Sequence, residues 1–262
     1  MVSNNGEYAL MPDVVLIQAQ DGSARLLDLA GSFFALSDSA TAMLTTALTQ
    51  DVPSAAKAVA DAYGVDLKQV RSDMESLLRS LERGRLVYRT AAPPPQRPTT
   101  PRLRARFVAG GLAAVACLPW LSSPMIGALL AFAYGCIHLL GWPAAVAAWQ
   151  RHCPPIARRN AAASGPSALQ AIDERLRDVA AAHWLKVGCK ERALACWALL
   201  HWAGVDARIV VGIDLYPLSS HCWCVVGSRV LTDYEDRCLR FRPIVQYPPD
   251  GDALPHSSIA LP

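Results

Sequence analysis

Three residues in the last third of the chain have the types and order of a catalytic cysteine triad: Cys189, His221 and Asp233. Cys189 stands at the expected start of a helix, where unpaired backbone N–H groups and the helix dipole favour a thiolate. Lys190 and Arg192 add positive charge beside it. An imidazole within hydrogen-bond reach activates such a nucleophile, and a carboxylate orients the second ring nitrogen. These residues predict acyl-transfer chemistry on a peptide or amide.

The chain has 8 cysteines, and the others give weaker signals. No two have CxxC spacing and no secretory signal opens the sequence, so we expect reduced thiols. Cys196 lies two turns into the expected helix among apolar residues and is predicted to be core. Cys222 and Cys224 face away from His221 on one strand, which also disfavours a zinc site from these three residues and Cys238. We expect no metal and no organic cofactor.

The elements expected around these residues make a compact core. Ser167 to His183 has the apolar spacing of an amphipathic helix, and a second helix runs from Cys189 to a stop at Gly204. A helix followed by an antiparallel sheet is typical of the papain and transglutaminase superfamily. The strands are expected at residues 207–213, 221–226 and 229–232, with a loop at 214–220 and a turn at 227–228.

The turn before the last of these strands decides whether the triad can form. With a two-residue loop at Gly227-Ser228, regular pairing would place Asp233 opposite Cys222, on the sheet face that points away from His221. A loop of three residues would move Asp233 to the face of His221. We therefore predict an odd-length loop or a one-residue bulge between Val225 and Leu231.

Four stretches of this region resemble the lasso-peptide leader peptidases, which are transglutaminase-like cysteine proteases. The stretches are CKERAL from Cys189, GVDARIVVG from Gly204, HCW from His221 and RVLTD from Arg229. By this resemblance Cys189 matches the nucleophile, His221 the base and Asp233 the orienting acid. Two positions depart from the family pattern: Lys190-Glu191 stands where a proline is common, and Cys222 where a small residue is usual. Both leave the shape of the subsites open.

The resemblance implies that the chain removes the leader of a ribosomally made precursor before a macrolactam ring closes. The implied partners are the leader region of that precursor and an ATP-dependent asparagine-synthetase-like macrolactam synthetase. The backbone N–H of Cys189 should supply one oxyanion donor. The second donor stays open, with a side chain between His183 and Lys186 as one candidate. Two alternatives remain: a transamidase or amidase of the same superfold, and a non-catalytic, membrane-associated peptide chaperone.

The stretch before the proline-rich segment Ala91–Arg102 has the pattern of a small separate domain. Apolar runs at Val14–Ile17 and Ala24–Leu29 flank the hairpin signal Asp21-Gly22-Ser23, and Ser32–Leu36 is a third strand. Three helices follow, through Leu48, from about Pro53 to Gly64 and from about Leu67 to a stop at Gly84, before a short strand at residues 86–88.

This order resembles the small peptide-recognition domain of the pyrroloquinoline-quinone biosynthesis D-type peptide chaperones. The resembling stretches are LLDL from Leu26, FFAL from Phe33 and VRSDMESLL from Val70. In that family a leader peptide adds as a strand beside the third strand and lies against the third helix. A winged-helix-like domain without a ligand is the alternative. By the resemblance, the leader-binding residues are Phe33, Phe34, Ala35, Leu36, Val70, Asp73, Met74 and Leu77.

Composition limits the remaining possibilities. Of 262 residues, 52% are hydrophobic and 18% charged, with a net charge of +3. The hydrophobic fraction is enough for a packed core, and the small net charge gives no reason to expect nucleic acid as a partner. Residues 107–149 carry no formal charge and have basic residues on both sides. We expect buried or membrane-surface helices there, with insertion into the membrane as the alternative.

The predicted fold class is α+β. An N-terminal winged-helix-like domain of three strands and three helices precedes a helical segment and a papain/transglutaminase-like cysteine protease core. The expected domains are residues 1–90 for leader recognition, 91–106 as a proline-rich linker, 107–165 as the apolar helical segment and 166–262 as the protease core. The expected location is the cytoplasm, with association with the inner face of the membrane left open.

Overall fold

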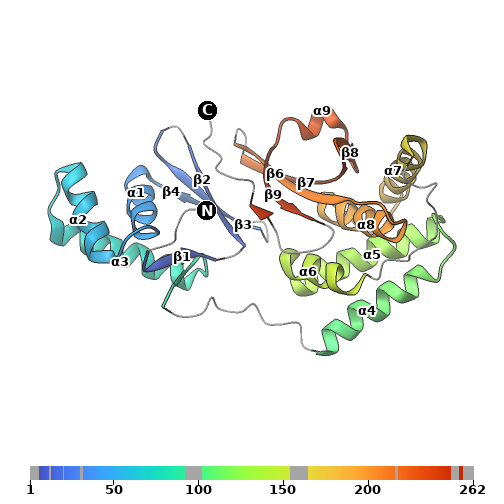
Figure 1. Ribbon diagram of the computed structural model, residues 1–262, viewed down its shortest axis with the longest axis horizontal. Coiled ribbons are helices and arrows are strands. Elements are labelled where there is room, and N and C mark those ends of the chain that lie inside the picture. The colour runs from blue at the N-terminus through green and yellow to red at the C-terminus, as the bar shows by residue number, and fades with distance from the viewer. Residues whose placement is uncertain are drawn as a thin grey trace. The chain divides into compact units, whose positions relative to one another are not determined.

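The computed structural model describes residues 6–11, 13–19, 21–29, 32–91, 102–153, 165–215, 218–248 and 254–255. The chain forms two compact units that divide between Arg97 and Pro98, inside the predicted linker (Figure 1). Both units contain helices and strands, which confirms the predicted α+β class. The helices expected as a separate apolar segment belong to the second unit.

The first unit follows the predicted order of strands, helices and a returning strand. Its elements are β1 Tyr8–Leu10, β2 Val14–Gln18, β3 Ala24–Asp28, β4 Phe33–Leu36, α1 Asp38–Ala47, α2 Val52–Tyr63, α3 Leu67–Arg83 and β5 Val87–Arg89. Strands β2, β3 and β4 form an antiparallel sheet in that order, which leaves β4 at an edge. The strand β1 was not predicted. It has only three residues and pairs with the distant β5, so it shows no alternating pattern of its own.

Local signals determine where the helices of this unit begin and end. Ser37, Asp51 and Asp66 are the N-caps of α1, α2 and α3, and each side chain accepts a hydrogen bond from a backbone N–H three residues later. Gly64 ends α2 with a φ of 63°, a conformation that costs glycine little. The helix α3 then closes the core with its apolar face, which buries Val70, Met74, Leu78 and Leu81.

The second unit packs its helices against a five-stranded antiparallel sheet in the order β10-β9-β6-β7-β8. Its elements are α4 Arg102–Ala116, α5 Ser123–Leu140, α6 Trp142–His152, α7 Pro166–Ala181, α8 Cys189–Trp202, β6 Arg208–Leu215, β7 Leu218–Val226, β8 Arg229–Leu231, α9 Glu235–Cys238, β9 Arg242–Tyr247 and β10 Leu254–Pro255. The predicted helices α7 and α8 and strands β6 to β8 are confirmed. The elements α9, β9 and β10 were not predicted, and strand replaces most of the loop expected at 214–220.

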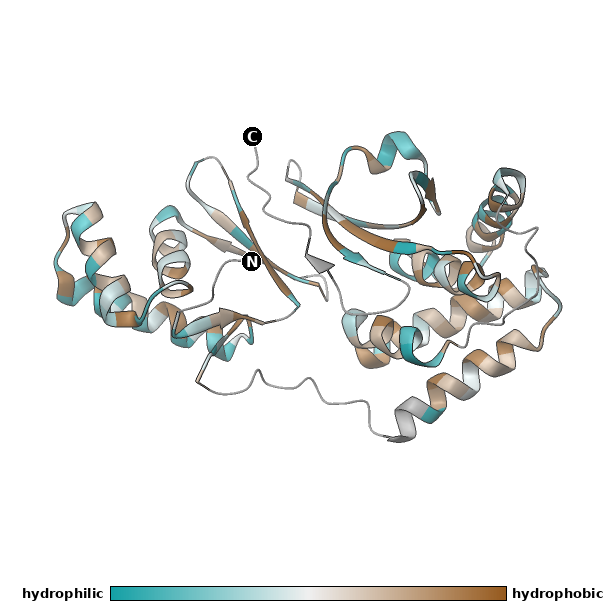
Figure 2. Ribbon diagram, in the orientation of Figure 1, coloured by the Kyte–Doolittle hydropathy of each residue, from teal (hydrophilic) through white to brown (hydrophobic). Residues whose placement is uncertain are grey.

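The apolar segment folds as α4, α5 and α6. Figure 2 shows α5 mostly in the brown and white of apolar and neutral residues, and it contacts α4, α6, α7 and α8. Within the described ranges, α5 is the one helix with the length and hydropathy of a membrane span, and 33% of that span is buried. A helix in a protein core meets the same criterion. The buried residues of α5 are Met125, Ile126, Leu129, Leu130, Ala133 and Cys136.

The turn between β7 and β8 differs from the prediction. Val226 pairs with Arg229, so Gly227-Ser228 forms a regular two-residue loop, with Gly227 at a φ of 59°. The predicted odd-length loop or bulge is therefore wrong. That prediction assumed that regular pairing continues to Asp233, whereas β8 ends at Leu231.

Candidate active site

His221 and Asp233 meet in the second unit. His221 lies in β7, and its Nε2 is 3.0 Å from Asp233 Oδ2. Both residues are buried, with exposed fractions of 4% and 5%. Because Nε2 faces the carboxylate, Nδ1 is the ring nitrogen left to act on a thiol. The structure thus brings together two of the three residues predicted for the triad.

Asp233 reaches the imidazole because the chain turns sharply after β8. Thr232 has a φ of 74°, in a region that β-branched residues rarely occupy and that costs about 1–3 kcal/mol. Regular pairing beyond Leu231 would place Asp233 opposite Cys222, on the other face of the sheet from His221. The turn at Thr232 therefore does what the predicted bulge was expected to do.

Aromatic rings enclose the imidazole on its sheet face. The Trp223 ring stacks on His221 with centroids 5.8 Å apart and an interplanar angle of 24°, and the Phe241 ring lies 5.0 Å away. Gly212, opposite His221 in β6, leaves the space that Trp223 occupies. A Cβ at Gly212 would lie 2.6 Å from the Trp223 ring.

The charges around the imidazole come from α8, from α9 and from Asp233 between β8 and α9. Arg237 Nη1 of α9 lies 3.4 Å from Asp233 Oδ2, and Arg192 Nη2 of α8 lies 3.7 Å from the same oxygen. Burial lowers the pKa of His221, the carboxylate of Asp233 raises it, and the two arginines lower it further. The net direction is downward, which favours the neutral imidazole that a general base requires.

Cys189 is the first residue of α8 and is half-buried. The Glu191 carboxylate accepts a hydrogen bond of 2.7 Å from the Gly188 N–H, which closes the start of the helix. A Cβ at Gly188 would lie 3.1 Å from that carboxylate. The predicted helix start at Cys189 is confirmed, so the thiol stands in the first turn of the helix.

The nucleophile helix and the imidazole approach the sheet from opposite faces. The α8 helix packs on β7, where Cys196 and Cys224 share a side-chain hydrogen bond. His221, with the opposite parity in β7, faces the other side. The pairing of β8 with β7 extends only to Cys224. Beyond the end of this pairing, Asp233 is contacted by Arg192 of α8 and by Arg237 of α9.

Arg192 connects the start of α8 with the acid. Its Nε donates to the Gly188 carbonyl at 3.3 Å, while its Nη2 lies near Asp233. Within the described part of the chain, no hydrogen bond joins the Cys189 thiol to the imidazole of His221. The link between the nucleophile helix and the His–Asp pair therefore runs through Arg192.

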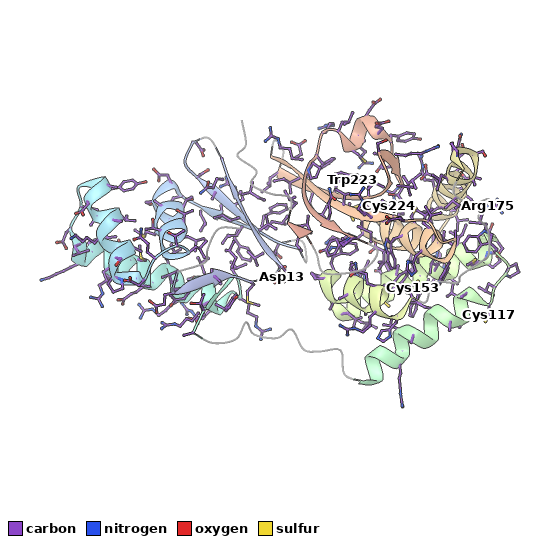
Figure 3. The ribbon with its side chains drawn as sticks, in the orientation of Figure 1. Asp13, Cys117, Cys153, Arg175, Trp223 and Cys224 are labelled. Atoms are coloured by element: carbon purple, nitrogen blue, oxygen red, sulfur yellow. The ribbon has the colours of Figure 1, made fainter. Side chains whose placement is uncertain are left out.

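The other thiols near the sheet are poor nucleophiles. Burial holds the pKa of Cys222 well above its ordinary value, and the nearby Cys189 raises it further. The hydrogen bond with Cys224, together with burial, raises the pKa of Cys196, and burial raises that of Cys238 to about 12. Figure 3 shows Trp223 and Cys224 as neighbours on β7.

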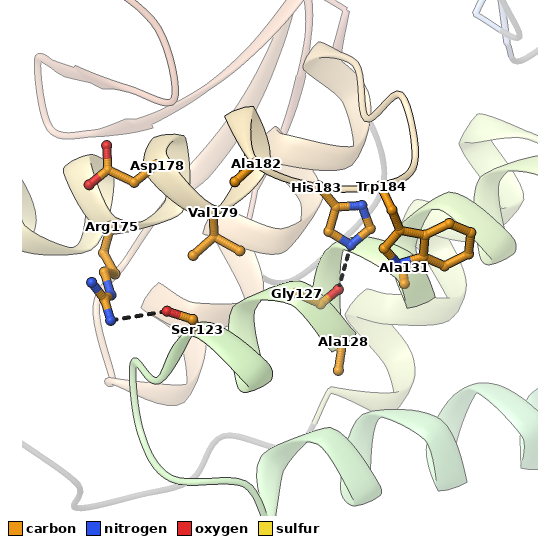
Figure 4. Close-up of a pocket in the computed structure, with 10 residues that line it drawn as sticks. All are labelled: Ser123, Gly127, Ala128, Ala131, Arg175, Asp178, Val179, Ala182, His183 and Trp184. Carbon is orange, nitrogen blue, oxygen red and sulfur yellow. Dashed lines mark hydrogen bonds between the residues drawn. The ribbon is translucent and has the colours of Figure 1, made fainter.

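A separate pocket of about 520 Å³ lies between α5 and α7 and includes His183 and Trp184 (Figure 4). His183 Nε2 is 3.1 Å from the Gly127 carbonyl, and Nδ1 accepts a hydrogen bond from the Leu185 N–H. Both ring nitrogens are therefore engaged, which removes His183 from the candidates for the second oxyanion donor. Trp184 is 82% exposed.

The predicted leader-binding residues divide into two groups. Leu36, Val70 and Met74 belong to the core of the first unit, so they have almost no surface that a peptide could contact. Leu36 is the last residue of β4. The helix α1, which contains none of the predicted leader-binding residues, contacts β4. The exposed or half-buried members are Phe33, Phe34, Ala35, Asp73 and Leu77.

Comparison with protein families gives a match in the second unit. Residues 136–246 match the transglutaminase-like superfamily. The match extends from α5 to β9 and includes all three residues of the predicted triad. This transglutaminase-like domain supports a peptidase- or amidase-like function. Comparison with curated proteins and with solved structures gives no match.

Several residues around the pair were not singled out from the sequence. Arg237 and Phe241 lie in segments that carried no predicted element. Arg192 was noted only as positive charge near Cys189, although the i, i+3 spacing places both residues on one helix face. That spacing was the one sequence signal for the contact of Arg192 with Asp233.

Proposed function

We propose that this chain is a cysteine peptidase that removes the leader from a lasso-peptide precursor before the macrolactam closes. The observation that carries the proposal is the buried contact of 3.0 Å between His221 Nε2 and Asp233 Oδ2 inside a transglutaminase-like domain. Cys189 at the start of α8 is the nucleophile. No cofactor enters the reaction.

The reaction proceeds through a thioester. His221 takes the proton of the Cys189 thiol, the sulfur attacks the peptide carbonyl, and the C–N bond breaks as His221 passes that proton to the departing amine of the core peptide. Water, deprotonated by His221, then attacks the thioester and releases the leader as a carboxylic acid with the thiol restored. The first-turn N–H groups of α8, that of Cys189 included, supply donors to the oxyanion.

The nucleophile and base must come closer when a substrate binds. Catalytic hydrogen bonds are often long in the free enzyme and tighten in the complex with substrate. Asp233 already lies against Nε2, so the Cys189 thiol must approach Nδ1. Arg192 keeps the helix start and the acid in register during this change.

The first unit offers an open strand edge to the leader. Bonded and non-bonded pairs alternate along an antiparallel ladder. The Asp28 N–H donates to the Ser32 carbonyl, so Phe34 forms the next bonded pair with β3 and Ala35 does not. The backbone N–H and C=O of Ala35 therefore point to the open edge of β4, where an added strand would pair with them.

The remaining partners follow from the family resemblance. An asparagine-synthetase-like macrolactam synthetase takes the core peptide after cleavage, and cleavage is fastest in its presence. Association with the inner face of the membrane through the apolar helix α5 is also part of the proposal. The net charge of +3 gives nucleic acid no role.

Alkylation of thiols tests the nucleophile without a substrate. We expect iodoacetamide at neutral pH to label Cys189 faster than Cys117, an exposed thiol that serves as the internal reference. In His221→Ala the rate at Cys189 should fall to that of the reference. A leader-bearing precursor, followed by mass spectrometry, should be split by the wild-type chain. Equal labelling of both thiols with an intact precursor would refute the peptidase and favour a peptide chaperone.

The superfamily match favours a second candidate, a transamidase. The same thioester would form, and an amine would take the place of water. Mass spectrometry of the precursor separates the two reactions. Hydrolysis gives a free leader acid, whereas transamidation attaches the acyl group to the added amine.

A further inference from the structure

The turn that brings Asp233 to His221 depends on a residue in an unfavourable conformation. Thr232, at a φ of 74°, is 1% exposed and leaves β8 just before the acid. Nothing in regular strand pairing would produce this conformation. Contacts from outside the hairpin must therefore hold it.

Thr232 is held by a carboxylate from another element. Its backbone N–H donates a buried hydrogen bond of 2.6 Å to Asp173 Oδ1 in α7. Its hydroxyl oxygen accepts a weaker bond of 3.4 Å from the Cys224 N–H. A charged acceptor makes the stronger hydrogen bond, so Asp173 is the main restraint on the turn.

Arg177 completes the restraint on the other side of the acid. It lies one helical turn after Asp173 and forms a salt bridge with Asp173 Oδ2. Its guanidinium also stacks over the Tyr234 ring at 4.8 Å. Asp173 therefore holds the residue before Asp233, and Arg177 the residue after it. A pocket of about 320 Å³ is lined by Asp173, Arg177, Asp233 and Tyr234, among others.

We propose that the Asp173–Arg177 ion pair of α7 is the positioning unit that directs the Asp233 carboxylate at His221. Neither residue touches the imidazole. The ion pair acts through the backbone of Thr232 and the ring of Tyr234. The proposal rests on the proposed function, in which Asp233 orients the base.

The test follows the imidazole of His221 by NMR titration in the full chain. Asp233 raises the pKa of this imidazole, while Arg192 and Arg237 lower it. Displacement of the carboxylate should therefore lower the pKa of His221 below its wild-type value. We expect this shift in Asp173→Ala, approaching that of Asp233→Asn, and a loss of about 100-fold in precursor cleavage.

Further variants separate positioning from simple destabilisation. Asp173→Asn keeps an acceptor and loses the charge, so its shift should be intermediate. Thr232→Gly removes the strain at positive φ; added to Asp173→Ala, it should restore part of the titration and the cleavage. Asp178→Asn, on an exposed position of α7, should behave as wild type.

An unchanged His221 titration in folded Asp173→Ala and Asp173→Asn, with a shift in Asp233→Asn, would overturn the proposal. So would the absence of rescue by Thr232→Gly in an otherwise folded double variant. If the titrations shift as expected but the wild-type chain cleaves no precursor, the positioning role holds and the proposed peptidase fails.

Discussion

The two units of this chain differ in the polar groups that they bury. Within the described residues, the first unit buries Asp13 and Thr41, whereas the second buries Asp173, Glu191, His221, Thr232 and Asp233. Four of the second set form one connected chain from α7 to β7. Charged groups are costly to bury unless they are paired. Their concentration marks the second unit as the place of the chemistry.

The first unit has a different character. Its core is apolar, its helices are closed by local caps, and its unusual feature is the open edge of β4. An edge with unpaired backbone groups favours the addition of another strand. We therefore propose binding for the first unit and bond cleavage for the second, so variants in each unit should affect only one of the two.

The largest effect is expected at the nucleophile. Cys189→Ala should reduce the rate of leader removal by at least about 1000-fold, because no other thiol is placed to form the thioester. Binding of the precursor, measured by titration calorimetry, should be unchanged. Cys196→Ala on the same helix is the control: it costs stability, because Cys196 is fully buried, but should keep most of the activity. An inactive Cys196→Ala beside an active Cys189→Ala would contradict the assignment.

The next effect concerns the space behind the imidazole. Gly212→Ala should destabilise the second unit by about 1–3 kcal/mol, because the new Cβ would lie 2.6 Å from the Trp223 ring and 2.9 Å from the Arg242 carbonyl. Gly135→Ala in α5 is the control. It has open space around its Cβ and should add about 0.5–1 kcal/mol of stability. Urea unfolding measures both, and equal stability of the two variants would contradict the close packing at Gly212.

The edge of β4 gives a smaller effect, on binding alone. Ala35→Pro removes an N–H that points to the open edge, so leader affinity should fall by about tenfold, the value of one lost hydrogen bond. The unfolding free energy should change little. Phe34→Pro is the contrasting variant, because it removes a bond to β3 and should destabilise the first unit. Unchanged affinity of Ala35→Pro for the leader would count against strand addition at this edge.

The smallest effect is on the pH dependence of activity. Arg237 lowers the pKa of His221, so Arg237→Gln should raise it. The acid limb of the rate profile then moves to higher pH, because the base is protonated earlier on acidification. Arg240→Gln, which removes a contact with Asp214, is the control and should leave the limb in place. A limb that moves to lower pH in Arg237→Gln would have the wrong sign.

The folded-state pKa of His221 also links the site to stability. Because this pKa is lowered, the buried neutral imidazole stabilises the fold at a pH above the ordinary histidine value. This contribution is lost as the pH falls through the lowered value. The second unit should therefore lose stability on mild acidification, and His221→Gln should reduce that loss.

Local sequence determined much of this protein. The helix starts near Pro53 and Leu67 and at Cys189 were predicted from the sequence, and the structure begins these helices at Val52, Leu67 and Cys189. Helix starts are local because a cap satisfies backbone groups within three residues of itself. The position of His221 in a strand followed from an apolar run of the right length. Helix starts and strand positions of this kind are determined by residues that are close together in the sequence.

The tertiary structure decided how the acid reaches the base. The sequence pattern assumed regular alternation up to Asp233 and so predicted a bulge, but the chain turns at Thr232 instead. That turn exists because Asp173, 59 residues earlier, accepts the Thr232 N–H inside the packed unit. Strain at one residue is stable only when distant contacts hold it. A short-range pattern carries no information about those contacts, whereas the packing of α7 on the sheet supplies them.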